Sequence, residues 1–210
     1  SVALDRDTLI VGAMQDDSGT TGVNGGPNEH VRGVGAAYVF VRNGTVWTRQ
    51  ANLKASQVTT GDRFGHSVAI SGDAAVVGAL GEDSSTTGVN SAPNESAADS
   101  GAAYVFVRRG TNWTQQAYLK ASQVTAGDYF GRSVTVSGDT VVVGAFLEDS
   151  STTGFNSVPD ESAVGSGAAY VFVRRGTSWI QHTYLKAPTV KAGHEFGYAV
   201  SVSDDTVIVG

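Results

Sequence analysis

Short segments in which apolar and polar side chains alternate run along the whole chain, separated by turns that contain glycine. In the segment GAAYVFVR at 101–108, Tyr104 and Phe106 fall on one face, and Val105 and Val107 fall on the other. Alternation with a period of two, rich in β-branched and aromatic residues, predicts β-strands. No segment shows the period of an amphipathic helix, so the sequence predicts an all-β fold.

Four such strands make up one unit of the pattern. The segment WTQQAYLKA at 113–121 predicts a strand with Trp113, Ala117 and Leu119 on one face. The short sequences SGD and RGTN supply the turns, and the first copy has Asn-Gly in place of RGTN, which is a strong hairpin signal. The strands expected in the second copy are 67–70, 74–79, 101–108 and 113–121.

The unit repeats every 66 residues, and 45 of 66 positions are identical between 67–132 and 133–198. Four antiparallel strands repeated at a fixed period are typical of β-propeller blades, whereas the alternative, a β-solenoid, uses shorter coils. We therefore predict a β-propeller segment of four-stranded antiparallel blades. The expected domains are blade 1 at 1–63, blade 2 at 64–129, blade 3 at 130–195 and the first two strands of a further blade at 196–210.

Phe-Gly opens the first strand of a unit, Gly-Ala closes the second, and the third strand is aromatic. Together these features resemble the FG-GAP repeats of integrin-α-type propellers, and the resemblance covers the whole chain. It implies a propeller that acts in adhesion or ligand recognition. The chain departs from that family in two ways. The Pro of Gly-Ala-Pro is replaced by Met14, Leu80 and Phe146, and the calcium loop Asp-x-Asp-x-Asp-Gly is absent, so the resemblance implies no metal site there.

Both ends of the sequence fall inside a repeat, because Ser1 aligns with Ser67 and Gly210 aligns with Gly78. We expect an excerpt of a longer protein, with neighbouring blades on both sides and any targeting signal outside the excerpt. A closed propeller takes about four to eight blades. Exposed apolar blade faces associate in water, so we expect the isolated chain to self-associate, for example as a ring of six or seven blades from two chains.

A long polar phrase, GEDSSTTGVNSAPNES at 81–96, recurs as LEDSSTTGFNSVPDES at 147–162 and in a degenerate form at 15–30. In an antiparallel blade, the loop after the second strand and the link to the next blade lie at the same end. Every blade therefore displays its long loop on one face, and repeated insertions of this kind often form a binding face. We expect a protein or glycan ligand on this long-loop face.

The long phrase also carries side-chain oxygens at alternate positions, with a glycine that permits a sharp turn. That pattern is typical of a calcium loop, and calcium is the one cofactor that the sequence indicates. The alternative is a loop held by its own Asx and Ser/Thr turns, because hydroxyls are poor calcium ligands. The candidate metal ligands are Asp17, Asp83, Ser85, Thr87, Asn90, Asp149, Ser151, Thr153 and Asn156.

Some residues recur at the same position in every unit. The tryptophans would suit sugar stacking, but aromatic residues at strand spacing more often pack between blades. We expect the phenylalanine of each Phe-Gly pair to wedge between blades, and the recurring lysine to cover a blade edge with its ammonium group in water. These positions are Trp47, Trp113 and Trp179, then Phe64, Phe130 and Phe196, and finally Lys54, Lys120 and Lys186.

Composition narrows the classes of function. A net charge of −6 argues against binding nucleic acid. The chain has no cysteine, which excludes disulfides and Cys-ligated zinc, and no apolar run approaches the roughly 18 residues that span a membrane. No Ser/His/Asp set, carboxylate pair or phosphate loop stands out, so we expect no catalytic residues.

The sequence therefore favours a non-enzymatic module for adhesion or ligand recognition through the long-loop face, secreted or at the cell surface. Two alternatives stay open. One is a structural scaffold or filament building block whose repeats assemble among themselves. The other is a lectin with one glycan site per blade.

Overall fold

A computed structural model describes residues 1–26, 28 and 30–210; Pro27 and Glu29, in the first copy of the long phrase, lie outside this description. Every regular element in the described residues is a strand, which confirms the prediction of an all-β fold. None of these residues forms a helix long and apolar enough to cross a membrane. The strands are β1 (Val2–Asp5), β2 (Thr8–Ala13), β3 (Ala36–Asn43), β4 (Val46–Leu53), β5 (Phe64–Ser71), β6 (Ala74–Ala79), β7 (Ala102–Arg109), β8 (Asn112–Leu119), β9 (Ser133–Ser137), β10 (Thr140–Ala145), β11 (Ala168–Arg175), β12 (Ser178–Leu185), β13 (Val200–Ser203) and β14 (Thr206–Val209).

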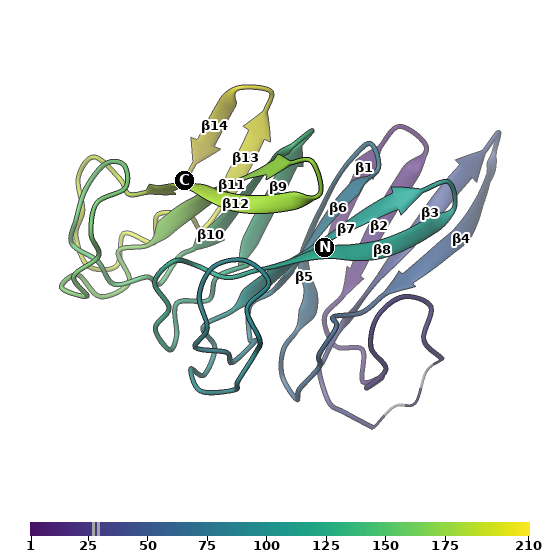
Figure 1. Cartoon of the computed structure of the whole chain (residues 1–210), viewed down its shortest axis with the longest axis horizontal. Coiled ribbons are helices and arrows are strands. Elements are labelled where there is room, and N and C mark those ends of the chain that lie inside the picture. The colour runs from purple at the N-terminus through teal and green to yellow at the C-terminus, as the bar shows by residue number, and fades with distance from the viewer. Residues whose placement is uncertain (27, 29) are drawn as a thin grey trace.

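The strands form successive antiparallel sheets in chain order. β1–β4, β5–β8 and β9–β12 make three four-stranded sheets, and β13 and β14 make a two-stranded sheet. The sheets stand side by side as blades, with the hairpin turns toward one end and the long loops toward the other (Figure 1). The first strands β1, β5, β9 and β13 contact one another in that order. This arrangement is that of propeller blades around an axis.

A β-bulge in the last hairpin of each four-stranded sheet changes which residues share a face. In β8, Gln115 and Ala117 pair with consecutive residues of β7, which leaves Gln116 as the extra residue. An extra residue inverts the alternation beyond it. Trp113 therefore lies on the face opposite Ala117 and Leu119, and the expectation that all three share one face is wrong.

The second and third blades each bury an aromatic face against an aliphatic face of the blade before it. In the second blade, Tyr104, Phe106 and Trp113 belong to the aromatic face, and in the first blade Val39 and Leu53 belong to the aliphatic face. The same residue types meet between the second and third blades. Because the core lies between sheets, both faces of an interior sheet are apolar, which is why its strands carry apolar residues at consecutive positions.

The phenylalanine of each Phe-Gly pair lies in this layer. Phe130 is 1% exposed and meets Tyr170 and Phe172 edge-on, with ring centres 5.4 and 6.1 Å apart. Phe64 makes the equivalent contacts one blade earlier. The predicted wedge is thus confirmed for these two residues. Phe196 is only half-buried, because it lines a hollow beside β14.

The tightest contact between blades involves the main chain. A Cβ atom added to Gly78, in the Gly-Ala pair of β6, would lie 2.1 Å from the carbonyl oxygen of Gly131, in the Phe-Gly pair of the next blade. Ser67 Oγ donates a hydrogen bond of 2.8 Å to the same oxygen. Only glycine leaves room for this approach. The contact recurs in the pairs Gly12–Gly65 and Gly144–Gly197.

We predict that Gly78→Ala destabilises the protein by about 3 kcal/mol, because the added methyl group forces the second and third blades apart. Gly78 does not have a left-handed backbone, so alanine is compatible with its backbone conformation and the loss measures the contact itself. Urea unfolding gives the free energy. The matched control is Gly26→Ala, where an added Cβ meets nothing within 4 Å. Equal stability of the two variants would contradict the prediction.

Candidate functional site

The long loops leave the blades at a common end. They connect β2 to β3, β6 to β7 and β10 to β11, and the links between blades lie at the same end (Figure 1). An isolated β-bridge, with further backbone hydrogen bonds beside it, ties each loop to the last strand of its own blade. These bridges join Val23 to Leu53, Val89 to Leu119 and Phe155 to Leu185.

A buried ion pair lies beneath each long loop. Lys120 is fully buried, and its Nζ lies 2.8 Å from Glu82 Oε2. The same nitrogen donates to Ser100 Oγ at 2.8 Å and to the Gly101 carbonyl at 2.6 Å. The expectation that the recurring lysines hold their ammonium groups in water is therefore wrong, because protein oxygens replace the water. The equivalent pairs are Lys54–Asp16 at 2.8 Å and Lys186–Glu148 at 2.6 Å.

These carboxylates were missed at the sequence level, although a signal was present. Glu82 and Lys120 recur together with the repeat, always 38 residues apart. The Tyr118 hydroxyl donates to the second oxygen of Glu82 at 2.7 Å, so the carboxylate is held on both sides. Burial lowers the pKa of Lys120, and the charge of Glu82 opposes that shift. Losing either partner would leave an uncompensated buried charge, so the pair anchors the base of the loop.

The structure gives most of the predicted metal ligands partners within the protein. Asp83 Oδ1 accepts a hydrogen bond of 2.7 Å from the Asp99 amide, which lies 16 residues further along the loop. Ser85 donates through its hydroxyl to Asn94, at 3.1 Å. Asn90 Oδ1 accepts from the Tyr118 amide at 2.9 Å. The equivalent acceptors or donors in the other copies are Asp17, Asp149, Ser151 and Asn156.

These bonds point the candidate ligands toward different partners. Thr87 and Thr153 have no side-chain hydrogen bond within the residues that the structure describes. Within the same residues, no group of three or more His, Cys, Asp or Glu side chains could hold a metal ion. The hydrogen bonds are those expected of the alternative, a self-bonded loop. Calcium binding stays a prediction that only a measurement can decide.

The links between blades carry a second set of buried carboxylates. Asp62 is 3% exposed and accepts hydrogen bonds from the amide and the hydroxyl of Thr59, both at 2.6 Å. Burial, together with the negative charges of Glu82 and Glu95, raises the pKa of Asp62 to about 7. Asp128, at the equivalent position, has its pKa raised to about 6 by burial. The Thr59 hydroxyl oxygen also lies 2.9 Å from Glu95 Oε2, which brings this link against the long loop of the next blade.

A patch of residues that differ from copy to copy lies at the same end of the blades, where the first strands begin. Arg132 lies over the ring of Tyr198, with its guanidinium carbon 4.2 Å from the ring centre, and 5.8 Å from the ring of Phe146. Phe146 also contacts Tyr198 and Tyr129, with ring centres 5.5 and 5.8 Å apart. We call Met14, His66, Tyr129, Arg132, Phe146 and Tyr198 the variable patch.

In the variable patch, side chains at equivalent repeat positions differ in their chemistry. His66, Arg132 and Tyr198 occupy one repeat position with three different side chains, and they line a hollow of about 380 Å³ along the first strands. His66 Nδ1 lies 3.3 Å from the sulfur of Met14. Burial lowers the pKa of His66 to about 4, and the positive charge of Arg132 contributes to that shift. The residues were visible in the sequence as breaks in the period, but their convergence was not.

The recurring tryptophans form no exposed platform in the inner blades. Trp113 and Trp179 are each 3% exposed, and their indole Nε1 atoms donate to Gln50 and Gln116 of the preceding blade, both at 2.8 Å. These glutamines are the bulge residues of the preceding sheets. The core interpretation is confirmed for these two residues, while Trp47 on the first blade is 41% exposed.

We predict that stability falls as the pH rises from about 4 to about 7, in part through Asp62. The folded state keeps the proton of this carboxyl up to about pH 7, whereas the unfolded chain loses it near its ordinary pKa of 3.8. The folded state therefore binds more protons in that window, and raising the pH removes the stabilisation. Asp62→Asn should be more stable than the wild type at pH 8 and gain less at pH 5, measured by urea unfolding. A gain that does not depend on pH would contradict this assignment.

We predict that Asp83→Ala lowers the free energy of unfolding by about 1–2 kcal/mol, equally with calcium and with a chelator, because it removes the hydrogen bond to the Asp99 amide. Melting curves of both proteins in millimolar calcium and in EGTA provide the measurement. If calcium raises the melting temperature of the wild type and this rise is lost in Asp83→Ala, the calcium loop is correct instead, since a ligand of the native state stabilises it.

Comparison with known families agrees with this architecture. A family model described as an FG-GAP repeat matches residues 47–106 and 113–172, which together are more than half of the chain. Each match begins at a tryptophan in the last strand of one blade and ends in the third strand of the next, so it contains the Phe-Gly pair and the Gly-Ala pair of one blade. A search of curated proteins finds no match. The chain belongs to the FG-GAP repeat family.

Proposed function

We propose that the protein is a non-enzymatic module for adhesion or ligand recognition, and that it binds through its long-loop face. The family supports the coarser part of this proposal, because FG-GAP repeats form propeller-type modules that often act in adhesion or ligand binding. Such repeats are generally non-enzymatic and typically extracellular. We propose the same location here, secreted or at the cell surface, and a protein or glycan as the ligand.

The variable patch is the observation that carries the proposal. Over most of each unit the copies agree, because the blades must pack on one another in the same way. At the start of the first strands, by contrast, the equivalent side chains are His66, Arg132 and Tyr198. Arginine and tyrosine are enriched among the residues that dominate binding energy at interfaces. Tyr198 is 47% exposed and Arg132 stacks on it, so both present surface beside a hollow.

The anchored loops form a firm rim at the same end of the blades as this patch. Each long loop stands on its buried ion pair, and the neighbouring link is joined to it through Thr59 and Glu95 or through Thr125 and Glu161. A surface that is ordered before binding loses less conformational entropy when a ligand arrives. The rim therefore favours recognition of a ligand by shape as well as by charge.

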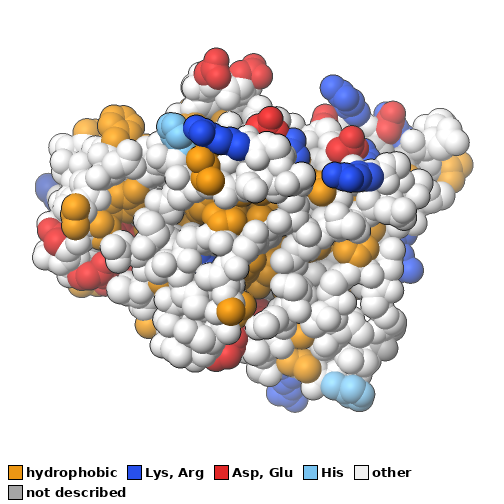
Figure 2. Space-filling view, viewed as in Figure 1, with side chains coloured by type: hydrophobic (Ala, Val, Ile, Leu, Met, Phe, Trp, Pro, Cys, Tyr) orange, Lys and Arg blue, Asp and Glu red, His pale blue; other side chains and the backbone are white. Residues whose placement is uncertain are grey.

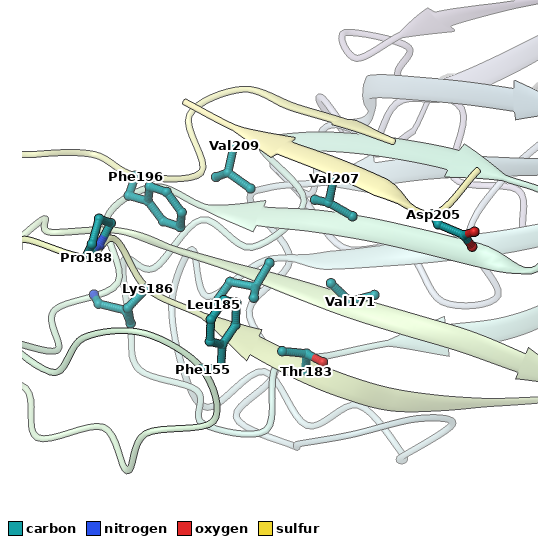
Figure 3. Close-up of a pocket in the computed structure, with 10 residues that line it drawn as sticks. All are labelled: Phe155, Val171, Thr183, Leu185, Lys186, Pro188, Phe196, Asp205, Val207 and Val209. Atoms are coloured by element: carbon teal, nitrogen blue, oxygen red, sulfur yellow. The ribbon is translucent and has the colours of Figure 1, made fainter. Parts of the chain in front are cut away.

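A second candidate function is a scaffold whose copies assemble with one another. A hollow of about 490 Å³ lies between β13–β14 and β11–β12, and Figure 3 shows Val171 and Leu185 on one side of it with Val207 and Val209 on the other. One blade earlier, the equivalents of these residues enclose aromatic side chains of the following blade. An apolar surface of this kind favours self-association or a neighbouring blade.

The test of the main proposal is binding by the whole chain to an array of glycans and of purified extracellular matrix proteins. We predict that Arg132→Ala and Tyr198→Ala each weaken binding to whatever target the array identifies by about tenfold or more, as expected of residues at the centre of an interface. The matched control is Arg175→Ala, because Arg175 lies at the opposite end of the blade, in the β11–β12 hairpin.

Circular dichroism would first establish that each variant folds. Binding that is lost in both patch variants and kept in the control supports the proposal. Binding that survives both patch substitutions places the site elsewhere, and no binding to any glycan or matrix protein would overturn the proposed function and favour the scaffold.

A further inference from the structure

The face opposite the long loops carries a second kind of chemistry. Charged side chains of both signs gather along the edge formed by the hairpin turns (Figure 2). In the second blade, Arg108 is paired with Asp73 at 2.8 Å and lies over the ring of Trp113, 5.3 Å from its centre. In the third blade, Arg174 is paired with Asp139 and lies over Trp179. Both guanidinium groups are thus held in place before any ligand arrives.

The two arginines differ in the hydrogen bonds of Nη1, the guanidinium nitrogen that faces away from the paired aspartate. Arg108 Nη1 donates to Thr8 Oγ1 at 3.1 Å and to Gln50 Oε1 at 3.4 Å, both from the first blade. The position of Thr8 is occupied in the second blade by Ala74. Arg174 Nη1 therefore lacks the hydroxyl partner, and within the described residues it also makes no hydrogen bond to Gln116, the equivalent of Gln50; the side chain of Arg174 is 27% exposed.

A second change at the same interface adds a positive charge. Asn43, at the end of β3, is replaced by Arg109 at the end of β7. Arg109 makes no ion pair within the described part of the chain. The interface between the second and third blades therefore has one hydroxyl fewer and one guanidinium more than the interface before it.

These two changes border a hollow of about 450 Å³, which we call the turn-side groove. Two carboxylates also line it, and both are occupied: Asp5 accepts a hydrogen bond of 2.6 Å from the Gly72 amide, and Asp73 is paired with Arg108. The groove therefore presents more positive than negative charge, on a chain whose net charge is −6. The charged residues that line it are Asp5, Arg6, Asp73, Arg108, Arg109 and Arg174.

We propose that the turn-side groove binds an acidic sugar through a sulfate or phosphate ester, with Arg174 and Arg109 contacting the oxyanion. The planar guanidinium fork matches the oxygens of these esters, and charge-assisted hydrogen bonds of this type are strong. The volume is in the range of small-molecule sites, so a sugar ring fits beside its ester group. This inference does not depend on the proposed function, because the groove lies at the other end of the blades.

Calorimetric titration of the whole chain tests the proposal with two probes, a heparin-derived hexasaccharide for the sulfate ester and glucose 6-phosphate for the phosphate ester. We expect at least one of them to bind. Two variants should each weaken that binding at least tenfold. Ala74→Thr introduces a hydroxyl that can accept a hydrogen bond from Arg174, as Thr8 does from Arg108 one blade earlier. Arg109→Asn introduces the residue found at the equivalent position 43.

The matched control is Arg175→Asn, which removes the same charge at the equivalent position of the next blade, outside the lining of the groove. It should leave the affinity within about twofold. Arg109 is exposed, so its replacement leaves the fold intact and keeps the test decisive even if Ala74→Thr disturbs the interface. Failure of both probes to bind at millimolar concentration overturns the proposal. Equal weakening by all three variants, or equal binding of single-stranded DNA, overturns it as well, because either result indicates a general attraction for anions.

Discussion

The rest of the structure depends on one main-chain contact between neighbouring blades. The glycine carbonyl oxygen of the Phe-Gly pair in one blade lies where a Cβ atom would stand on the glycine of the Gly-Ala pair in the preceding blade. At Gly78 and Gly131 this approach leaves no room for a Cβ atom. It fixes the distance between blades, and with it the layer in which aromatic side chains of one blade cover aliphatic side chains of the other. Two short motifs 53 residues apart in sequence thus act as a single joint.

The buried ion pairs extend this joint to the long loops. A loop of mostly polar residues buries little apolar surface and has to be held by hydrogen bonds and charges instead. Lys120 and Glu82 do so beneath the second loop, with Tyr118 holding the carboxylate in turn. Because Asp62 sits in the adjoining link with a raised pKa, we expect the region around the loops to respond to pH. The same elements recur in the third blade, so the frame is uniform while the residues of the variable patch differ.

The blades differ chemically at the positions where equivalent residues of the repeat are not the same. At the long-loop end, His66, Arg132 and Tyr198 replace one another around a hollow. At the turn end, Ala74 stands in place of Thr8 and Arg109 in place of Asn43, and both line a groove. A repeat protein keeps the positions that pack between units alike, since each unit contacts only its neighbours. Exposed positions can diverge without disturbing the fold, and Tyr198 and Arg109 are such positions.

The sequence by itself determined the strands, their order and the blade, because the alternation of side chains and the repeat period can be read without knowing which strands or blades pack together. It also placed the long loops on a common face, since antiparallel strands leave no other arrangement. It did not determine that Trp113 lies opposite Leu119, because one extra residue at Gln116 inverts the pattern without changing its composition. Nor did it reveal that the ammonium group of Lys120 is buried. The sequence pattern is the same for a lysine that ends in water and for one that is paired, and only the fold brings the carboxylate of Glu82, 38 residues away, beside it. Those outcomes, like the convergence of the variable patch, were decided by the packing of blade on blade, which joins residues that no local pattern connects.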